Sequence, residues 1–178
     1  MKKSEMKELI RSAISPQSLC EVQFKYDLFV RYFFPFQVSD RFFLCAEQDD
    51  FLIDGFTIRR FSDMTKVQIE NGKRVEIIKS EGLLDGVFPP EIDLTDWHSV
   101  FLSLQKRNKN IIVEKESLYD DEWEYAIGYI EKVMKNKIVF RHFDAEGIWQ
   151  DTPYEIPFSQ ITSVTFDSRY VEIFSKYV

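Results

Sequence analysis

Acidic side chains form the densest group that could carry chemistry in this chain of 178 residues. In chain order they are Glu114, Glu116, Asp120, Asp121, Glu122 and Glu124. Converging carboxylates can hold a metal ion or act as general acids, but a calcium loop also needs a glycine at a fixed position. That pattern is missing, and closely spaced like charges discourage unwanted pairing of sheet edges. We interpret the run as a solvated turn.

Histidines and hydroxyl groups give no catalytic pattern either. His98 and His142 are the only histidines, whereas a zinc site uses several nitrogen or sulfur ligands at characteristic spacing. Hydroxyl residues recur at Ser62, Thr65, Ser159 and Thr162. A nucleophilic serine needs a base within hydrogen-bond reach and an oxyanion site, and no G-x-S-x-G motif accompanies them. We expect these hydroxyls to bond backbone groups, and we expect no enzyme activity, cofactor or metal.

Basic residues gather in the first half of the chain. Arg59, Arg60, Lys66, Lys73 and Arg74 are candidates for binding an anion, a nucleic acid or an acidic protein surface. The alternatives are a solvated face, or docking onto the acidic second half. Residues 1–90 contain 13 Lys and Arg against 14 Asp and Glu, and the remainder contains 10 against 16. The net charge of −7 disfavours RNA as a partner, because nucleic-acid binders are usually basic.

An unbroken aromatic cluster stands at Tyr32, Phe33, Phe34 and Phe36. Side chains alternate between the two faces of a strand, so one face cannot hide all four. We expect them to bury the junction between two barrels or a contact between copies, rather than to stack on a base or sugar.

Residues 56–78 and 154–174 carry the same segment twice. With one residue removed from the first copy at Arg59/Arg60 and another at its turn, eight of twenty-one aligned pairs are identical. The identical pairs are Ile58/Ile156, Phe61/Phe158, Ser62/Ser159, Thr65/Thr162, Val67/Val164, Val75/Val171, Glu76/Glu172 and Ile77/Ile173. Such a repeat indicates that a small domain was duplicated and joined in tandem.

Each copy lies within a helix followed by short strands. Apolar spacing predicts helices over 4–15 and from Thr95, and aligning their caps brings the following strands into step. In the second half, strands are predicted at 111–115, 123–133, 137–143, 154–158, 161–167 and 171–174. Tight turns between short strands are typical of a small closed or nearly closed barrel. We expect a mainly β chain with two helix-plus-barrel repeats, 1–79 and 95–178, joined by a packed linker at 80–94.

This pattern resembles the Sm-like fold, a version of the SH3-like barrel. Residues 127–130, Ile-Gly-Tyr-Ile, look like the opening of the Sm1 motif, in which the glycine allows a strand to bend sharply. The Asp of that family's RNA base pocket is replaced by Met134, and its Sm2 Ile-Arg-Gly is only echoed at residues 58–60. The resemblance implies the fold and the pairing of exposed barrel edges between units or copies.

The sequence therefore predicts a non-catalytic interaction module. We expect a cytoplasmic protein with a protein partner and no membrane contact, because no apolar run is long enough for a membrane helix. A homo-oligomer formed through barrel edges is a further possibility. The alternative function is RNA binding by an Sm-like protein through the basic residues of the first repeat.

Overall fold

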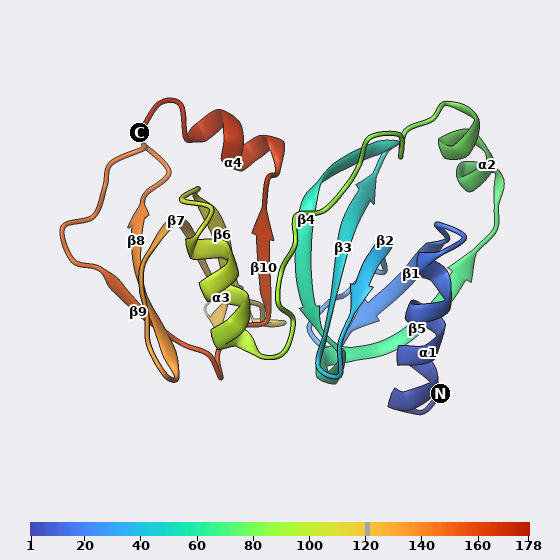
Figure 1. Ribbon diagram of the computed structural model, residues 1–178, viewed down its shortest axis with the longest axis horizontal. Coiled ribbons are helices and arrows are strands. Elements are labelled where there is room, and N and C mark those ends of the chain that lie inside the picture. Colours follow the sequence, from blue (N-terminus) through green and yellow to red (C-terminus); the bar gives the residue numbers. More distant parts are fainter. Residues whose placement is uncertain (120–121) are drawn as a thin grey trace. The chain divides into compact units, whose positions relative to one another are not determined.

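The computed structural model describes residues 1–119 and 122–178 and contains two compact units, Met1–Pro90 and Glu91–Val178. Both units are mainly β with short helices (Figure 1). The segment expected to be a linker divides between them, with residues 80–90 in the first unit and 91–94 in the second.

The first unit is a helix, a five-stranded antiparallel sheet and a second helix. Its elements are α1 (Lys3–Ile14), β1 (Leu19–Phe24), β2 (Arg31–Val38), β3 (Phe42–Asp49), β4 (Leu52–Arg60), β5 (Met64–Glu70) and α2 (Lys73–Ser80). A short 3-10 helix, η1 (Phe61–Asp63), joins β4 to β5. The strand order is β5-β1-β2-β3-β4, so the chain forms a meander whose last strand returns to pair with the first.

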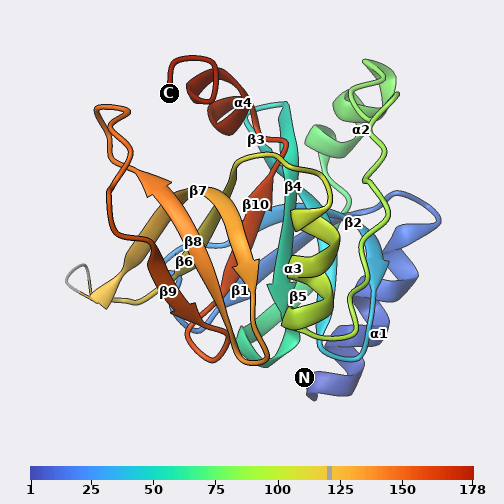
Figure 2. The same ribbon diagram turned by 60° about the vertical axis from the view of Figure 1, so that its left-hand side comes forward.

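The second unit repeats this element order. It comprises α3 (Trp97–Gln105), β6 (Ile111–Lys115), β7 (Glu124–Val133), β8 (Lys137–Phe143), β9 (Tyr154–Pro157), β10 (Ser163–Phe166) and α4 (Arg169–Phe174). Its strand order is β10-β6-β7-β8-β9. Figures 1 and 2 show α3 running along one face of these strands.

Strand register matches between the two units as well. Cys20 lies opposite Phe33 in the first unit, and Ile111 lies opposite Gly128 in the second. The ladder is also interrupted at the same place, once within residues 35–37 of β2 and once within residues 130–132 of β7. We call two residues equivalent when they hold the same register position in the two units.

The register corrects the alignment of the repeated segment. Arg59 pairs with Phe43 on β3, and Ile156 pairs with Ile138 at the matching position on β8. Arg59 is therefore equivalent to Ile156, and no residue has to be removed at Arg59/Arg60. The identity of Ile58 with Ile156 had favoured the gap, but the two residues are one register position apart and point to opposite faces of the sheet.

The last part of each repeated segment is helical, and the strand predicted over 171–174 is wrong. Residues 73–80, which the repeat placed in parallel with it, form α2. The helices begin after Gly72 and Ser168, and the Ser168 side chain accepts a hydrogen bond from the Val171 backbone. Valine, isoleucine and phenylalanine favour strands, but burial of Val75 and Val171 at the same helical position outweighs this propensity.

Opposite faces of each sheet carry different helices. The first helix covers one face, through buried Met6, Ile10 and Ala13 in α1 and through Trp97, Phe101 and Leu104 in α3. In the first unit, the face beneath α1 also holds Cys20, Phe24, Phe33 and Cys45. Val75 of α2 and Val171 of α4 pack in clusters that contain residues of the other face.

No ladder among the residues that the structure describes closes the five strands of either unit, so of the predicted closed or nearly closed barrel the closed form is not seen. Within its own unit, the strand order runs from β5 to β4 in the first and from β10 to β9 in the second. In the first unit η1 spans the gap between the two end strands. The helices, rather than closure of the sheet, cover the two faces.

Candidate functional site

In the first unit, α2 and the turn after it cover one face of the sheet. The cluster there contains Leu19, Phe34, Val75, Ile78 and Leu84, all of them buried. Phe34 is only 1% exposed. The chain turns back after α2 at Gly82, which has a φ of 64°, and the Leu83 backbone donates to the Ile78 carbonyl at 3.0 Å. This glycine-ended helix cap brings Leu84 onto the face.

A cavity of about 590 Å³ opens on the equivalent face of the second unit. It is lined by Asn108, Lys109, Asn110, Tyr129, Asp167, Val171, Glu172, Ser175 and Lys176. A smaller hollow of about 290 Å³ shares Asn108, Lys109 and Tyr129 with it. Small-molecule and peptide-side-chain sites are commonly concave spaces of roughly 300–1,000 Å³, so the cavity is large enough to bind a ligand.

Two lining residues, Tyr129 and Val171, hold positions that are buried in the cluster of the first unit. Tyr129 is equivalent to Phe34 by register, and Val171 is equivalent to Val75 because each is the third residue after its helix cap. Tyr129 is 37% exposed, whereas Phe34 is 1% exposed. The same face is therefore covered in the first unit and accessible in the second.

The turn that leads into the cavity wall also has its counterpart. Asn108 has a φ of 51°, and Gln17, which precedes Cys20 by the same three residues as Asn108 precedes the equivalent Ile111, has a φ of 48°. Asn110 follows Asn108 and is equivalent to Leu19. A buried leucine of the first unit is thus replaced by an amide in the wall of the cavity.

Ion pairs fix one wall of the cavity. Asp167 accepts from Arg107 at 2.6 Å and from Lys109 at 2.9 Å, and Glu172 lies 3.9 Å from Lys109. Burial raises the pKa of Asp167, but its bonds to Lys109 and Arg107 outweigh burial and hold the pKa below its usual value. This carboxylate therefore stays ionised and keeps the two basic side chains in place.

Hydrogen bonds fix other residues of the lining. The Asn110 amide donates to the Ser175 hydroxyl at 2.8 Å, and that hydroxyl donates to the Val171 carbonyl at 2.6 Å. Tyr129 lies beside Trp149, with ring centroids 5.4 Å apart. The cavity thus combines an aromatic ring, one aliphatic side chain and polar groups of both signs, a composition suited to binding.

No family model, no curated protein and no solved structure matches the chain. The site is therefore interpreted from its own geometry. In the described part of the chain, no helix is long and apolar enough to cross a membrane. The same residues include no group of three or more His, Cys, Asp or Glu side chains placed to hold a metal ion.

The sequence had suggested that Arg59 belongs to an exposed basic patch, but the structure buries this residue. It is 1% exposed, and its guanidinium carbon lies 4.7 Å from the ring centroid of Phe24 and 5.8 Å from that of Phe33. It holds the position that Ile156 holds in the second unit. The structure therefore makes it a core residue, whose charge rests on aromatic faces.

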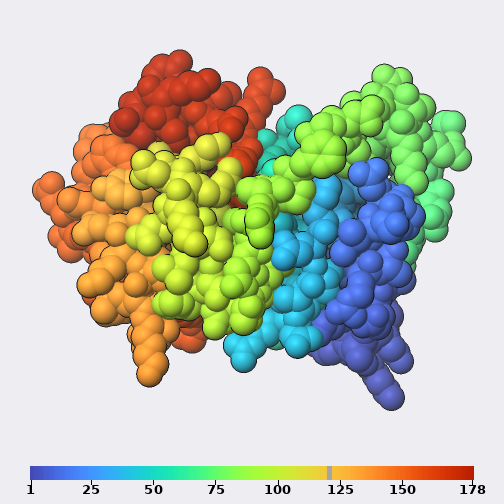
Figure 3. Space-filling view, viewed as in Figure 1, coloured from blue at the N-terminus to red at the C-terminus, as the bar shows by residue number. Residues whose placement is uncertain are grey.

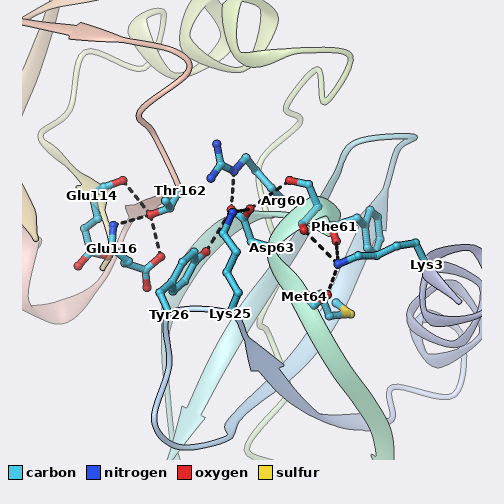
Figure 4. A network of polar contacts seen from close by, with 11 residues as sticks. Lys3, Lys25, Tyr26, Arg60, Phe61, Asp63, Met64, Glu114, Glu116 and Thr162 are labelled. Carbon is cyan, nitrogen blue, oxygen red and sulfur yellow. Dashed lines mark hydrogen bonds and ion pairs between the residues drawn. The ribbon is translucent and has the colours of Figure 1, made fainter. Parts of the chain in front are cut away.

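Arg60 is engaged in a polar network rather than free to form a positive surface. Its Nε donates to Asp63 at 2.5 Å, and Asp63 also pairs with Lys25 at 3.0 Å and accepts from Tyr26 at 3.3 Å (Figure 4). Asp63 itself is 1% exposed. The Lys3 ammonium bonds the backbone carbonyls of η1 and Met64 beside it. This network holds the turn between β4 and β5.

The other basic candidates lie on β5 and α2. Lys66, Lys73 and Arg74 are exposed. Lys73 pairs with Glu76 at 2.9 Å, and the Arg74 guanidinium lies 4.4 Å from the Tyr32 ring centroid. The five predicted residues therefore do not form one surface, because Arg59 is buried and Arg60 is held by Asp63.

The aromatic cluster divides between the two faces of the sheet, as the alternation predicts. Phe33 packs with the α1 face, whereas Phe34 is buried in the α2 cluster with Tyr32 and Phe36 partly buried against it. Three of the four side chains expected to bury a junction with another barrel or copy, Tyr32, Phe34 and Phe36, therefore pack in the cluster of α2 and Leu84 in their own unit. The prediction did not include α2, so it did not include this cover.

The repeated threonines, Thr65 and Thr162, bond backbone groups of a neighbouring segment. Thr162 donates to the Glu114 carbonyl at 3.0 Å and to Glu116 at 2.8 Å (Figure 4), and the equivalent Thr65 donates to the Gln23 carbonyl at 2.9 Å. The prediction that the repeated hydroxyls bond backbone groups is confirmed for these two threonines, whereas Ser62 donates to the Asp63 carboxylate at 3.2 Å. Within the acidic run, Asp120 and Asp121 lie outside the described residues.

Both cysteines are buried in the α1 face of the first unit. Burial raises the pKa of the Cys20 thiol to about 12 and that of Cys45 well above its usual value. Because the thiolate is the reactive species, we expect both thiols to react with Ellman's reagent at pH 8 at least ~100-fold more slowly in the folded protein than in guanidinium. Rapid labelling of the folded protein would show that this core opens readily.

Sequence reasoning did not predict the cavity. Tyr129 stood in the Ile-Gly-Tyr-Ile stretch and Val171 and Glu172 in the repeated segment, but none of the lining residues was taken as a binding residue. One signal was available: in the aligned repeats, Leu19 faces Asn110, an apolar-to-polar change at a position that one unit buries.

Proposed function

We propose that this protein is a non-catalytic binding module, made of two tandem units of the Sm-like or SH3-like type, and that the cavity of the second unit binds a segment of a partner protein. The observation that carries the proposal is the cavity at the place where the first unit buries Leu84. The proposed cellular location is the cytoplasm.

Four features support a duplicated helix-plus-barrel unit. The two units share the order of helices and strands, the strand order in the sheet and the strand register. They also share the place where the ladder is interrupted, which is two residues after Phe33 in β2 and two residues after Gly128 in β7. A first helix followed by five short strands is what the resemblance to Sm-like proteins implies. Because the sheets are open, helices bury sheet faces that barrel closure would bury in that family.

Binding rather than catalysis is supported by the way the polar groups of the cavity are engaged. Asp167 is tied to two basic side chains, and Ser175 donates to a backbone carbonyl. A catalytic base or nucleophile needs a free lone pair aimed at the substrate. These groups instead give the cavity a fixed shape, which lowers the entropy cost of binding.

RNA binding remains the second candidate, and the observation that favours it is the exposure of Lys66, Lys73 and Arg74 on the first unit. These three side chains would have to act without Arg59, which is buried. Assembly of copies through β5 and β9 is a further proposal, because among the described strands each of these two pairs on one side only.

The test is selection of linear peptides displayed on phage by the whole protein, followed by measured affinities of the selected sequences. We expect enriched peptides whose binding weakens at least about tenfold in the Tyr129→Ala protein, because the ring wall of the cavity is lost. The matched control is Tyr177→Ala, since Tyr177 is exposed and does not line the cavity.

RNA is tested in parallel by fluorescence anisotropy with a labelled oligouridine and a random oligonucleotide. Tight, salt-sensitive RNA binding that is lost in Lys66→Glu with Lys73→Glu, together with no enriched peptide, would replace the proposal by the RNA alternative. Peptide enrichment that Tyr129→Ala leaves unchanged would move the binding site away from the cavity.

A further inference from the structure

The first unit shows what fills this kind of site. Leu84 is buried against Phe34 and Val75, with Leu83 partly buried beside it. The segment reaches the face as a compact turn, in which the Asp85 and Val87 backbones donate to the Gly82 and Leu84 carbonyls at 2.9 and 3.1 Å. In the space-filling view, the green segment after α2 lies at the molecular surface (Figure 3). A short leucine-bearing turn is thus the natural occupant of this face.

The second unit keeps the features that recognise such a side chain. Tyr129 retains the aromatic ring of Phe34, and Val171 retains the valine of the second helix. An aliphatic side chain gains affinity from the apolar area that it removes from water. The ring of Tyr129, which is 37% exposed, provides such area in the lining of a cavity of about 590 Å³, and the 3% exposed Val171 lines the same cavity.

The second unit also adds polar groups that the first unit lacks. Asn110 replaces Leu19, and Lys109 and Lys176 stand where the first unit has Ser18 and Ser80. An amide can bond the backbone of a docked segment, and lysine ammonium groups attract a carboxylate. With Arg107 included, this wall carries three basic side chains against Asp167 and Glu172. The balance of charge therefore favours a ligand with an acidic group.

We propose that the cavity binds a short segment of another protein that presents a leucine-like side chain next to an acidic residue, in the manner in which Leu84 and Asp85 stand together in the first unit. This inference rests on the proposed function and adds the chemistry of the occupant. The aliphatic side chain packs against the ring of Tyr129, and the carboxylate lies near Lys176.

The direct test uses a synthetic peptide of residues 81–88, EGLLDGVF, titrated into the whole protein and followed by NMR. We expect saturable shifts at Asn108–Asn110, Tyr129 and α4. Replacing the second leucine of the peptide, the counterpart of Leu84, by alanine should weaken binding at least about tenfold, because the buried aliphatic side chain is lost.

A charge reversal in the protein gives a second, independent readout. Lys176→Glu should weaken the peptide at least about fivefold, and raising the salt concentration should shrink that difference. The matched control is Lys135→Glu, which makes the same charge change in the exposed β7–β8 turn. Both lysines are exposed, so neither variant should alter the thermal unfolding curve.

The outcomes separate this inference from the proposed function. No saturable binding of EGLLDGVF up to about 5 mM, roughly 5,000 times a Kd of 1 μM, would overturn the leucine–acid occupant. Equal binding of the alanine peptide would also overturn it. Shifts confined to the Phe34 face would do the same, because they would show exchange with the first unit's own segment. If displayed peptides without these residues bind through Tyr129, the proposed function stands and only this inference fails.

Discussion

Gly128→Ala is expected to unfold the second unit or leave it only marginally folded. A Cβ at this position would lie 1.9 Å from the Arg141 carbonyl oxygen and 2.8 Å from the His142 Cα. Both atoms belong to the backbone of the paired strand β8, so no side-chain rotation relieves the overlap. We expect a loss of at least about 3 kcal/mol in the free energy of unfolding, measured by urea denaturation with circular dichroism.

Gly86→Ala is the matched control for this variant. Gly86 has a φ of 79°, and a Cβ there meets nothing within 4 Å. It should therefore cost only about 1 kcal/mol, from the backbone conformation alone. Similar urea midpoints for the two variants would show that β7 and β8 can separate at Gly128, and the tight strand contact described above would be wrong.

Arg59→Glu is expected to destabilise the first unit by at least about 3 kcal/mol, because it buries a carboxylate against aromatic faces that repel it. The wild-type guanidinium lies over Phe24 and beside Phe33, where a cation is attracted. The measurement is urea denaturation followed by far-ultraviolet circular dichroism. Tryptophan fluorescence would report on the second unit alone, because every tryptophan lies there.

Lys66→Glu makes the same charge change on the exposed side of β5 and is the control. It should change the free energy of unfolding by less than about 0.5 kcal/mol. If Arg59→Glu were as well tolerated as Lys66→Glu, the arginine would have to reach solvent, and its core position would be disproved. The expected result also means that loss of binding in an Arg59→Glu protein reports on folding rather than on a surface.

Periodicity predicted most of the elements from the sequence. The stripes that contain Met6 and Trp97 mark α1 and α3, and the strands over 111–115 and 137–143 have the predicted bounds. These segments bury one regular face, so their spacing reflects their structure directly. Gly128 was expected to let a strand bend, and the structure gives a different reason for the glycine, because a Cβ there would overlap the backbone of β8.

The errors came from residues whose surroundings are distant in sequence. An arginine has no apolar character, so nothing local indicates that Arg59 sits over Phe24 and Phe33. The segments around Val75 and Val171 are too short for helical periodicity to show, and their β-branched residues favour strands. The cavity depends on which face Leu84 covers in one unit, and this is a property of packing that the sequence pattern does not contain.

Arg59 also has a consequence for how the chain avoids misfolding. Two similar units on one chain can exchange strands while they fold, and such domain swapping is a characteristic failure of repeat proteins. If β4 took the place of β9, Arg59 would occupy the position of Ile156 opposite Ile138, without Phe24 and Phe33 beneath it. Burying a charge without those partners costs several kcal/mol, about as much as a small domain's whole stability. A single substitution in one core thus makes otherwise similar strands non-interchangeable and directs each to its own unit.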